Sequence, residues 1–298
     1  MSLFKLVRSD KSENPFSSHK YQRGMLCSLI ESMDRQADPP RKNEDGLVHV
    51  SSLVRGDCPR AIALSIMHKT YAPQSIQSAN RIVWAIGRAV ENHVRIQLIE
   101  SVGADMVYGR WSCKCGTLSF VGRGGKSSVC GACDSPANQY FEEPLRDLKH
   151  GLIGNPDITL LIGGRIMPVE IKSIKTTTTA QHQGFDTLRN DPLTDHALQV
   201  ACYYRMASLT LSKKLGMRMA KRPVVLYAAK DFTPGSAYKE MPVHLEDYEK
   251  QVDDIFADSL AIKHMIAGGS PVNRLSTCSK ITSSTALKCG LVHPCFHR

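Results

Sequence analysis

The chain has 298 residues, 42% of them hydrophobic, and carries a formal net charge of +10 with a pI of about 9.1. These values exclude a disordered chain and favour an ordered globular protein of one large α/β domain or two domains. No apolar run reaches about 18 residues and residues 1–5 do not begin a signal peptide, so we expect a soluble cytoplasmic protein with no membrane contact. The basic excess favours a polyanionic partner, most commonly a phosphate backbone, although an acidic protein also fits.

The sequence opens with a polar stretch, and we expect residues 1–47 to form an arm with one short helix. A helix that starts at Pro59 is predicted next, because proline suits the first helical turn. Cys58 comes directly before this proline.

A long helix is predicted over residues 78–101 from its apolar periodicity. Ile86, His93 and Ile96 belong to one stripe, which we expect to face the core. By spacing alone His93 is more simply a packed core histidine than a catalytic one, and Glu91 with Arg95 has the spacing of a surface ion pair.

Four cysteines interrupt the regular pattern after this helix. Cys113 and Cys115 form one close pair, Cys130 and Cys133 form another, and the segment between them is rich in glycine. Two such pairs are typical of a zinc ribbon with a closed, structural tetrahedral site. Cys-x-Cys in place of the commoner Cys-x-x-Cys is a modest departure, and a degenerate ribbon or another metal stays open.

A hairpin of chemical interest follows the ribbon. Residues 158–162 and 166–171 are predicted strands, joined by the Gly163-Gly164 turn. Because side chains i and i+2 of a strand share a face, Glu170 and Lys172 emerge together, and Asp157 begins the partner strand. Two carboxylates beside a lysine favour a divalent-metal site, whereas an edge hairpin with a solvated Glu/Lys pair is the simpler alternative.

The remaining elements are predicted as a polar loop over residues 173–191, a helix over 194–211, a strand over 223–229 and a helix over 246–267. Basic residues cluster between 213 and 222, where a solvated surface and a DNA-tracking patch are equally good interpretations. The tail after residue 270 has little regular pattern and holds Cys278, Cys289 and Cys295. Composition alone does not link these three to Cys58.

Five short motifs occur in order along the chain. They are Cys58-Pro59-Arg60, Gly87 with His93, Pro156-Asp157, Glu170-Ile171-Lys172, and Gln199 with Tyr203 in a Gln-x-x-x-Tyr pattern, followed by the late cysteines. As a set they resemble the RecB-like branch of the PD-(D/E)XK nucleases, in particular the iron–sulfur exonucleases of CRISPR adaptation and their bacteriophage relatives. Relatives have a tighter Gly…His spacing. They also have a cysteine where this chain has Ala286, and Cys278 lies well before that position.

The resemblance implies roles for these residues. Asp157 and Glu170 would hold Mg²⁺ or Mn²⁺, with His93 and the backbone carbonyl of Ile171 as further ligands. Lys172 would position or deprotonate the attacking water. Gln199 and Tyr203 would contact DNA or hold the metal ligands in place. The four cysteines 58, 278, 289 and 295 would hold a structural [4Fe–4S] cluster, with zinc as the main rival.

The implied fold is α/β, with a restriction-endonuclease-like core in which helices flank a small central mixed sheet. We expect this core over residues 48–109 and 141–298, a zinc-ribbon insertion over 110–140, and a cysteine-clamped C-terminal tail. The expected activity is metal-dependent DNA cleavage, most simply by an end-directed single-strand exonuclease in phage-type recombination, replication or genome processing. Single-stranded DNA or duplex ends, and replication, recombination or virion proteins, are the expected partners, in the host cytoplasm or on the virion. A packaging or head-completion nuclease and a non-catalytic DNA-binding protein are the alternatives.

Overall fold

The computed structural model describes residues 46–68, 78–116, 118–121, 130, 132–135, 139–177, 183–231 and 236–296. The predicted short helix of the N-terminal arm lies outside these residues. By its internal contacts the chain divides into two units, residues 1–41 with 73–85 and residues 42–72 with 86–298. The second unit holds both sheets and every candidate site residue. The domain division expected from the sequence stays a prediction.

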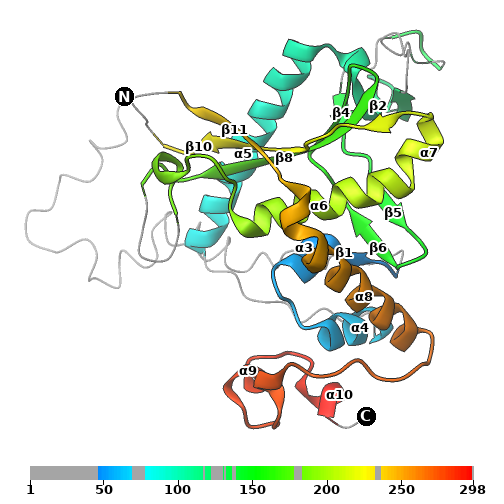
Figure 1. Cartoon of the computed structure of the whole chain (residues 1–298), viewed down its shortest axis with the longest axis vertical. Coiled ribbons are helices and arrows are strands. Elements are labelled where there is room, and N and C mark those ends of the chain that lie inside the picture. Colours follow the sequence, from blue (N-terminus) through cyan, green and yellow to red (C-terminus); the bar gives the residue numbers. More distant parts are fainter. Residues whose placement is uncertain are drawn as a thin grey trace, which may run out of the picture. The chain divides into compact units, whose positions relative to one another are not determined.

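A mixed sheet forms the centre of the second unit (Figure 1). Its strands run in the order β11-β10-β8-β7-β2-β3, with β4 beside β2 and β9 beside β8. Their bounds are β2 Val107–Ser112, β3 Leu118–Val121, β4 Gln139–Phe141, β7 Ile158–Ile162, β8 Arg165–Ile174, β9 Arg218–Met219, β10 Val224–Ala229 and β11 Tyr238–Pro242. A smaller sheet has the order β1-β6-β5, with β1 Val48–His49, β5 Leu145–Asp147 and β6 Leu152–Gly154. The expectation of a mixed α/β fold is confirmed.

The predicted hairpin is present as β7 and β8. These strands pair antiparallel from Ile158 opposite Val169 to Ile162 opposite Arg165. Both turn residues, Gly163 and Gly164, have positive φ, which glycine adopts without the steric cost of a Cβ atom. Strand β8 continues to Ile174, three residues beyond its predicted end, because β10 pairs with this extension in parallel.

Eight helices and four 3₁₀ turns lie in the described part of the chain. The helices are α3 Val50–Val54, α4 Pro59–His68, α5 Ser78–Val102, α6 Thr194–Leu209, α7 Leu211–Leu215, α8 Glu249–Ile266, α9 Ser284–Leu287 and α10 Val292–Phe296. The 3₁₀ turns are η2 Ala104–Met106, η3 Phe185–Thr187, η4 Leu245–Tyr248 and η5 Ser276–Cys278. Helix α6 connects the parallel strands β8 and β10, as such pairs require a crossover (Figure 1).

Helices α5 and α6 pack on opposite faces of β8. Val94 of α5 packs with Val169 and Ile171, whose buried side chains project from one face of the strand. Glu170 lies on the other face, where Gln199 of α6 contacts it. The acidic strand is therefore held between the two helices.

The predicted core stripe of α5 is wrong for most of its residues, although Val90, which belongs to it, packs against the core. Ile86, His93 and Ile96 are exposed, whereas Val94 is buried and Leu98 packs beside it. Gly87 lies on the face that meets β8, and a Cβ atom there would come within 3.2 Å of Ser173 Oγ. Because Gly87 lets α5 approach β8 closely, the helix turns its glycine face to the sheet, and its more aliphatic stripe stays exposed.

Candidate active site and metal centres

Asp157 lies at the point where β7 and β8 begin to separate. The register that places Ile158 opposite Val169 brings Asp157 beside the following residue of β8, Glu170. Asp157 Oδ2 accepts a hydrogen bond of 2.6 Å from the backbone N–H of Ile171. A main-chain donor thus fixes the orientation of this carboxylate at the open end of the hairpin.

Glu170 Oε1 is the meeting point of two side chains. Lys172 Nζ donates to this oxygen at 2.5 Å, as expected for residues i and i+2 on one face of a strand. Gln199 Nε2 donates to it at 2.8 Å and lies 2.7 Å from the hydroxyl of Tyr203. The structure therefore brings together five of the residues predicted for the site, namely Asp157, Glu170, Lys172, Gln199 and Tyr203.

The two carboxylates influence each other electrostatically. Burial raises the pKa of Asp157 well above its usual value, and the neighbouring Glu170 raises it further. Burial also raises the pKa of Glu170, against the opposing effect of Lys172. For Lys172, burial disfavours the ammonium, but the charges of Glu170 and Asp157 outweigh burial and raise its pKa. A buried and a half-buried acid share one cation, so the site favours additional positive charge.

One atom identifies where that charge fits. Glu170 is buried, and its second oxygen, Oε2, has no hydrogen-bond partner among the described residues. A buried acceptor without a donor is costly unless a ligand satisfies it. Carboxylate oxygens are the donors that Mg²⁺ and Mn²⁺ prefer, so Glu170 Oε2 together with Asp157 fits a divalent cation.

Glu91 is a site residue that the sequence interpretation missed. Its Oε1 accepts hydrogen bonds from the backbone N–H of Ser173 at 3.3 Å and from Ser173 Oγ at 2.9 Å. Its negative charge contributes to the raised pKa of Lys172. Gly87 and Glu91 are four residues apart on one helical face, so the pattern Gly-x-x-x-Glu was available in the sequence as a signal.

His93 lies apart from these residues. Its side chain is exposed, and no described contact joins it to Asp157, Glu170 or Lys172. The alternative of a packed core histidine is wrong, and the ligand role implied by the resemblance stays a prediction. The predicted pair of Glu91 with Arg95 is also replaced, since Arg95 forms its ion pair with Glu142.

His196 and Tyr227 form a second layer behind Lys172. Tyr227 is the register partner of Lys172 on the neighbouring strand. Its hydroxyl accepts from the backbone N–H of Leu193 at 3.0 Å and lies within hydrogen-bond distance, 2.9 Å, of Nδ1 of His196. Burial, with a smaller effect from Lys172, lowers the pKa of His196 to about 4. His196 is therefore uncharged at neutral pH.

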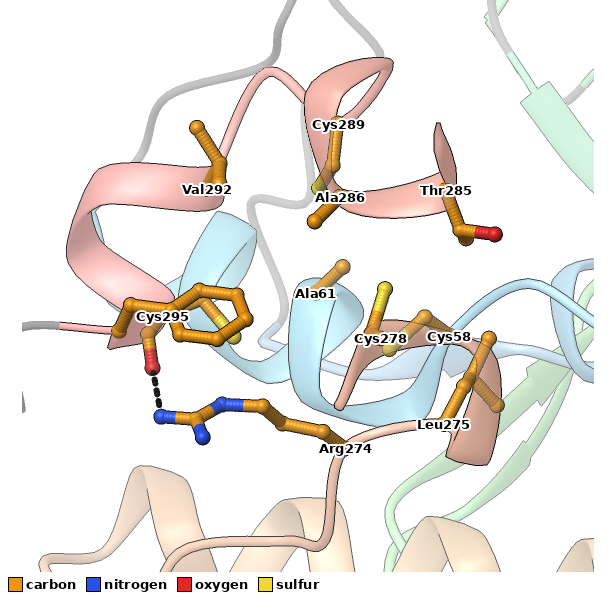
Figure 2. Close-up of a pocket in the computed structure, with 11 residues that line it drawn as sticks. Cys58, Ala61, Arg274, Leu275, Cys278, Thr285, Ala286, Cys289, Val292 and Cys295 are labelled. Atoms are coloured by element: carbon orange, nitrogen blue, oxygen red, sulfur yellow. Dashed lines mark hydrogen bonds between the residues drawn. The ribbon is translucent and has the colours of Figure 1, made fainter. Parts of the chain in front are cut away.

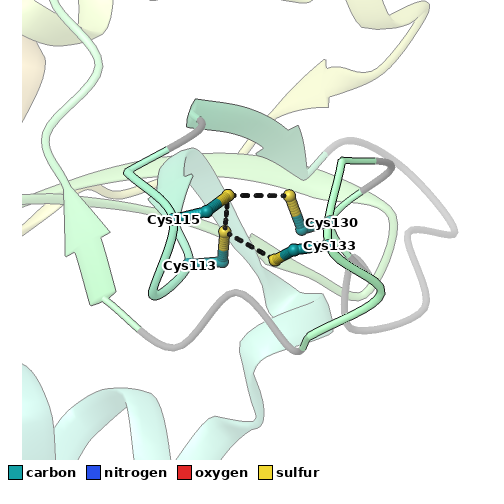
Figure 3. Close-up of side chains that lie close together, drawn as sticks. All are labelled: Cys113, Cys115, Cys130 and Cys133. Atoms are coloured by element: carbon teal, nitrogen blue, oxygen red, sulfur yellow. Dashed lines mark hydrogen bonds between the residues drawn. The ribbon is translucent and has the colours of Figure 1, made fainter.

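The ribbon cysteines form a compact group between β2 and β4 (Figure 3). The sulfur of Cys113 lies 2.9 Å from that of Cys115 and 3.5 Å from that of Cys133, and Cys115 lies 3.6 Å from Cys130. Four sulfurs on one zinc ion, each about 2.3 Å from the metal, lie roughly 3.8 Å apart. The group therefore fits a four-coordinate metal such as zinc.

The second cysteine group surrounds a cavity of about 70 Å³ (Figure 2). Cys58 precedes α4, and three tail cysteines at 278, 289 and 295 complete the lining. The structure thus brings residue 58 and the tail together, which local spacing alone did not predict. Among the described residues, the ribbon cysteines are the one group of three or more possible ligands whose ligand atoms all lie within 4.8 Å of one another, so this second set is more widely spaced.

Comparisons with known proteins add little. No protein-family model matches the chain, and no characterised protein matches it significantly. A crystal structure of SSO0001 is similar over 85% of this chain and 91% of that chain, with 14% identity and a TM-score of 0.35. A similarity this weak carries no argument about fold or function. None of the helices in the described ranges is long and apolar enough to cross a membrane.

Proposed function

We propose that this protein is a metal-dependent DNA nuclease whose active site is built on Asp157, Glu170 and Lys172. The observation that carries the proposal is the free, buried Oε2 of Glu170 beside Asp157, with the ammonium of Lys172 on the other oxygen of the same carboxylate. Two acids and an amine at one strand end form a donor set suited to phosphodiester hydrolysis.

Each side chain has a distinct task in this proposal. Asp157 and Glu170 hold the cation, and Gln199 keeps Glu170 turned so that Oε2 stays free. A bound Mg²⁺ or Mn²⁺ supplies Lewis acidity, which polarises the scissile phosphate and acidifies water. Lys172, which the neighbouring carboxylates hold as an ammonium, orients the attacking water and offsets charge on the phosphorus in the transition state. Tyr203 supports Gln199 from the next helical turn.

The order of elements supports a restriction-endonuclease-like core. Helix α5 precedes the antiparallel strands β2, β7 and β8, and α6 then leads to β10, parallel to β8. This part of the mixed sheet has helices on both faces, as expected for such a core. The ribbon cysteines lie between β2 and β4, before the hairpin that carries the site.

DNA is the proposed substrate because the chain is strongly basic and the site suits phosphodiesters. We propose an end-directed exonuclease that acts on single strands. A packaging nuclease would share the same chemistry and differ in its protein partners, and a binding protein would lack turnover.

For the second cysteine group we propose a [4Fe–4S] cluster. Zinc draws four sulfurs to roughly 3.8 Å from one another, whereas thiolates around a larger cluster stand further apart. The wider spacing of the second group and the cavity at its centre support the larger occupant. The centre would clamp the tail to α4 and take no part in the cleavage chemistry.

The test uses purified full-length protein with end-labelled single-stranded and duplex DNA in the presence of Mn²⁺. We expect the wild type to shorten the labelled strands and Asp157→Ala to leave them intact. A covalently closed single-stranded circle separates the modes, since an end-directed enzyme leaves it whole. Persistence of linear DNA with both proteins would contradict the proposal.

A further inference from the structure

Two arginines converge on the last cysteine of the second group. Arg60 of α4 donates from Nη2 to the carbonyl oxygen of Cys295 at 3.1 Å and from Nη1 to that of Val272 at 3.0 Å. Arg274 donates from Nη2 to the same Cys295 oxygen at 2.9 Å (Figure 2). Two guanidinium groups are thus gathered at one peptide of the tail.

Both cations lack a negative partner in the described part of the chain. The side chain of Arg60 is buried, and no carboxylate pairs with it or with Arg274. The Nε atoms of both are buried without a hydrogen-bond acceptor. An uncompensated buried charge and an unsatisfied buried donor are both destabilising. Arg60 is buried and Arg274 half-buried, and an anion close by would compensate the charge of both.

The cysteine cavity is the place for that anion. Arg274 lines the cavity together with the four cysteines, and Arg60 follows Cys58 by two residues. Arg274 also stacks on Phe296, with its Cζ 4.1 Å from the ring centroid, which holds the guanidinium at the cavity wall. Four thiolates carry four negative charges, and Zn²⁺ or an oxidised [4Fe–4S] core returns two positive ones. The occupied centre would be a dianion, whose charge the two guanidinium groups would balance.

We propose that Arg60 and Arg274 are the counter-ions of a dianionic metal–thiolate centre held by the four cysteines 58, 278, 289 and 295, and that the free Nε–H of Arg274, which lines the cavity, is a donor toward its sulfur atoms. The inference rests on the proposed cysteine centre and is independent of the nuclease chemistry. Both arginines act as positioning residues, because they fix the peptide of Cys295 and neutralise the centre's charge. Loss of such outer partners typically lowers metal affinity about 10- to 100-fold.

The experiment compares anaerobically purified full-length wild type with Arg274→Gln, Arg274→Lys and the matched control Arg205→Gln. Arg205 also stacks on a phenylalanine, Phe256, but it is exposed and pairs with Asp253. Iron, sulfide and zinc are counted per chain, and the rate of metal loss to a chelator is then measured. The zinc content of the ribbon serves as the internal control for correct folding of each variant.

We expect Arg274→Gln to lose the second metal centre about tenfold faster than the wild type, with Arg274→Lys in between because it keeps the charge and loses the fork. Arg205→Gln is expected to match the wild type. Equal retention by Arg274→Gln and the wild type would overturn the inference. So would a wild type with ribbon zinc and no second metal, and that result would leave the nuclease proposal standing. If Arg274→Gln also loses ribbon zinc, it is not properly folded and Arg274→Lys becomes the test. Loss of the second metal centre from Arg274→Lys at the wild-type rate would then overturn the inference.

Discussion

At the scale of single residues, Glu170 divides its two oxygens between protein and ligand. Oε1 receives Lys172 and Gln199, whereas Oε2 has no described partner. The strand alternation of the sequence predicted that Glu170 and Lys172 share a face, and the motif resemblance proposed Gln199. The sequence could not predict the allocation of oxygens, because it depends on how α6 packs across β8.

Gln199 is expected to act through Glu170. Gln199→Ala removes the donor that orients the Glu170 carboxylate, so we expect Mn²⁺ affinity to fall about 10- to 100-fold. Titration of Mn²⁺ followed by electron paramagnetic resonance measures this affinity without reference to DNA. Gln251→Ala, an exposed change on α8, is the matched control. Equal affinities for the two variants would show that Gln199 has no orienting role.

His196 is expected to make stability depend on pH. Its pKa is lowered to about 4, so the folded state binds fewer protons than the unfolded state between that pH and 6.5. The stabilisation is complete above about pH 6.5 and is lost as the pH falls toward 4, by at most roughly 3 kcal/mol. Urea unfolding of the wild type and His196→Gln from pH 7 to 4 measures the difference. Identical pH dependence in the two proteins would contradict the assignment.

Glu91 shows where residue-level prediction reached its limit. The resemblance directed attention to Gly87 with His93, yet the contact with β8 comes from Glu91. Both residues lie on the same helix, and their angular separation decides which one reaches the strand. That orientation is set by packing at Gly87, which one sequence without a partner surface does not reveal.

At the scale of elements, local signals predicted the hairpin well. The Gly163-Gly164 turn and the β-branched strands depend on near neighbours, so their geometry is encoded locally. The breaks were less predictable. The single helix expected over 194–211 ends at Leu209, and α7 begins at Leu211, while the helix expected from 246 starts with the 3₁₀ turn η4. Such interruptions arise from tertiary packing.

Close packing between β6 and α6 is predicted to matter for the site. A Cβ atom at Gly154 would lie 2.6 Å from Cε1 of Tyr203, so Gly154→Ala must displace the ring that contacts Gln199. We expect a loss of about 1–3 kcal/mol in unfolding free energy, together with slower DNA cleavage. Denaturant unfolding measures the first effect. Combining it with Tyr203→Leu relieves the clash, so the two changes should be less than additive, and simple additivity would refute the contact.

At the scale of the whole second unit, the two cysteine groups differ in how far apart their members lie in the sequence. The ribbon cysteines are close in sequence, so their spacing sufficed to predict a metal-sized group. The second group joins Cys58 to the tail, a connection that only the resemblance suggested before the structure placed them around one cavity. A contact between residues so far apart in the sequence does not change the local pattern of apolar residues, so that pattern could not predict it.

Zinc in the ribbon is expected to order the region around Trp111. This tryptophan is 3% exposed, lies on β2 just before Cys113, and packs edge-on against Tyr140 of β4. We expect Cys130→Ser to lose one zinc ion per chain and to shift tryptophan emission to the red, because β4 then separates from β2. Metal analysis with fluorescence tests this. Unchanged zinc content would contradict a four-cysteine zinc site.

The central claim is that the carboxylates at the open end of β7 and β8 hold the cation for DNA cleavage. The most direct measurement is the rate at which a single-stranded oligonucleotide is cut as Mn²⁺ is raised, for the wild type, Glu170→Gln and the exposed control Glu240→Gln on β11. We predict saturable cleavage by the wild type and the control, and a rate at least about 100-fold lower for Glu170→Gln at every Mn²⁺ concentration. Equal rates for all three proteins, or no cleavage by any of them, would contradict the claim.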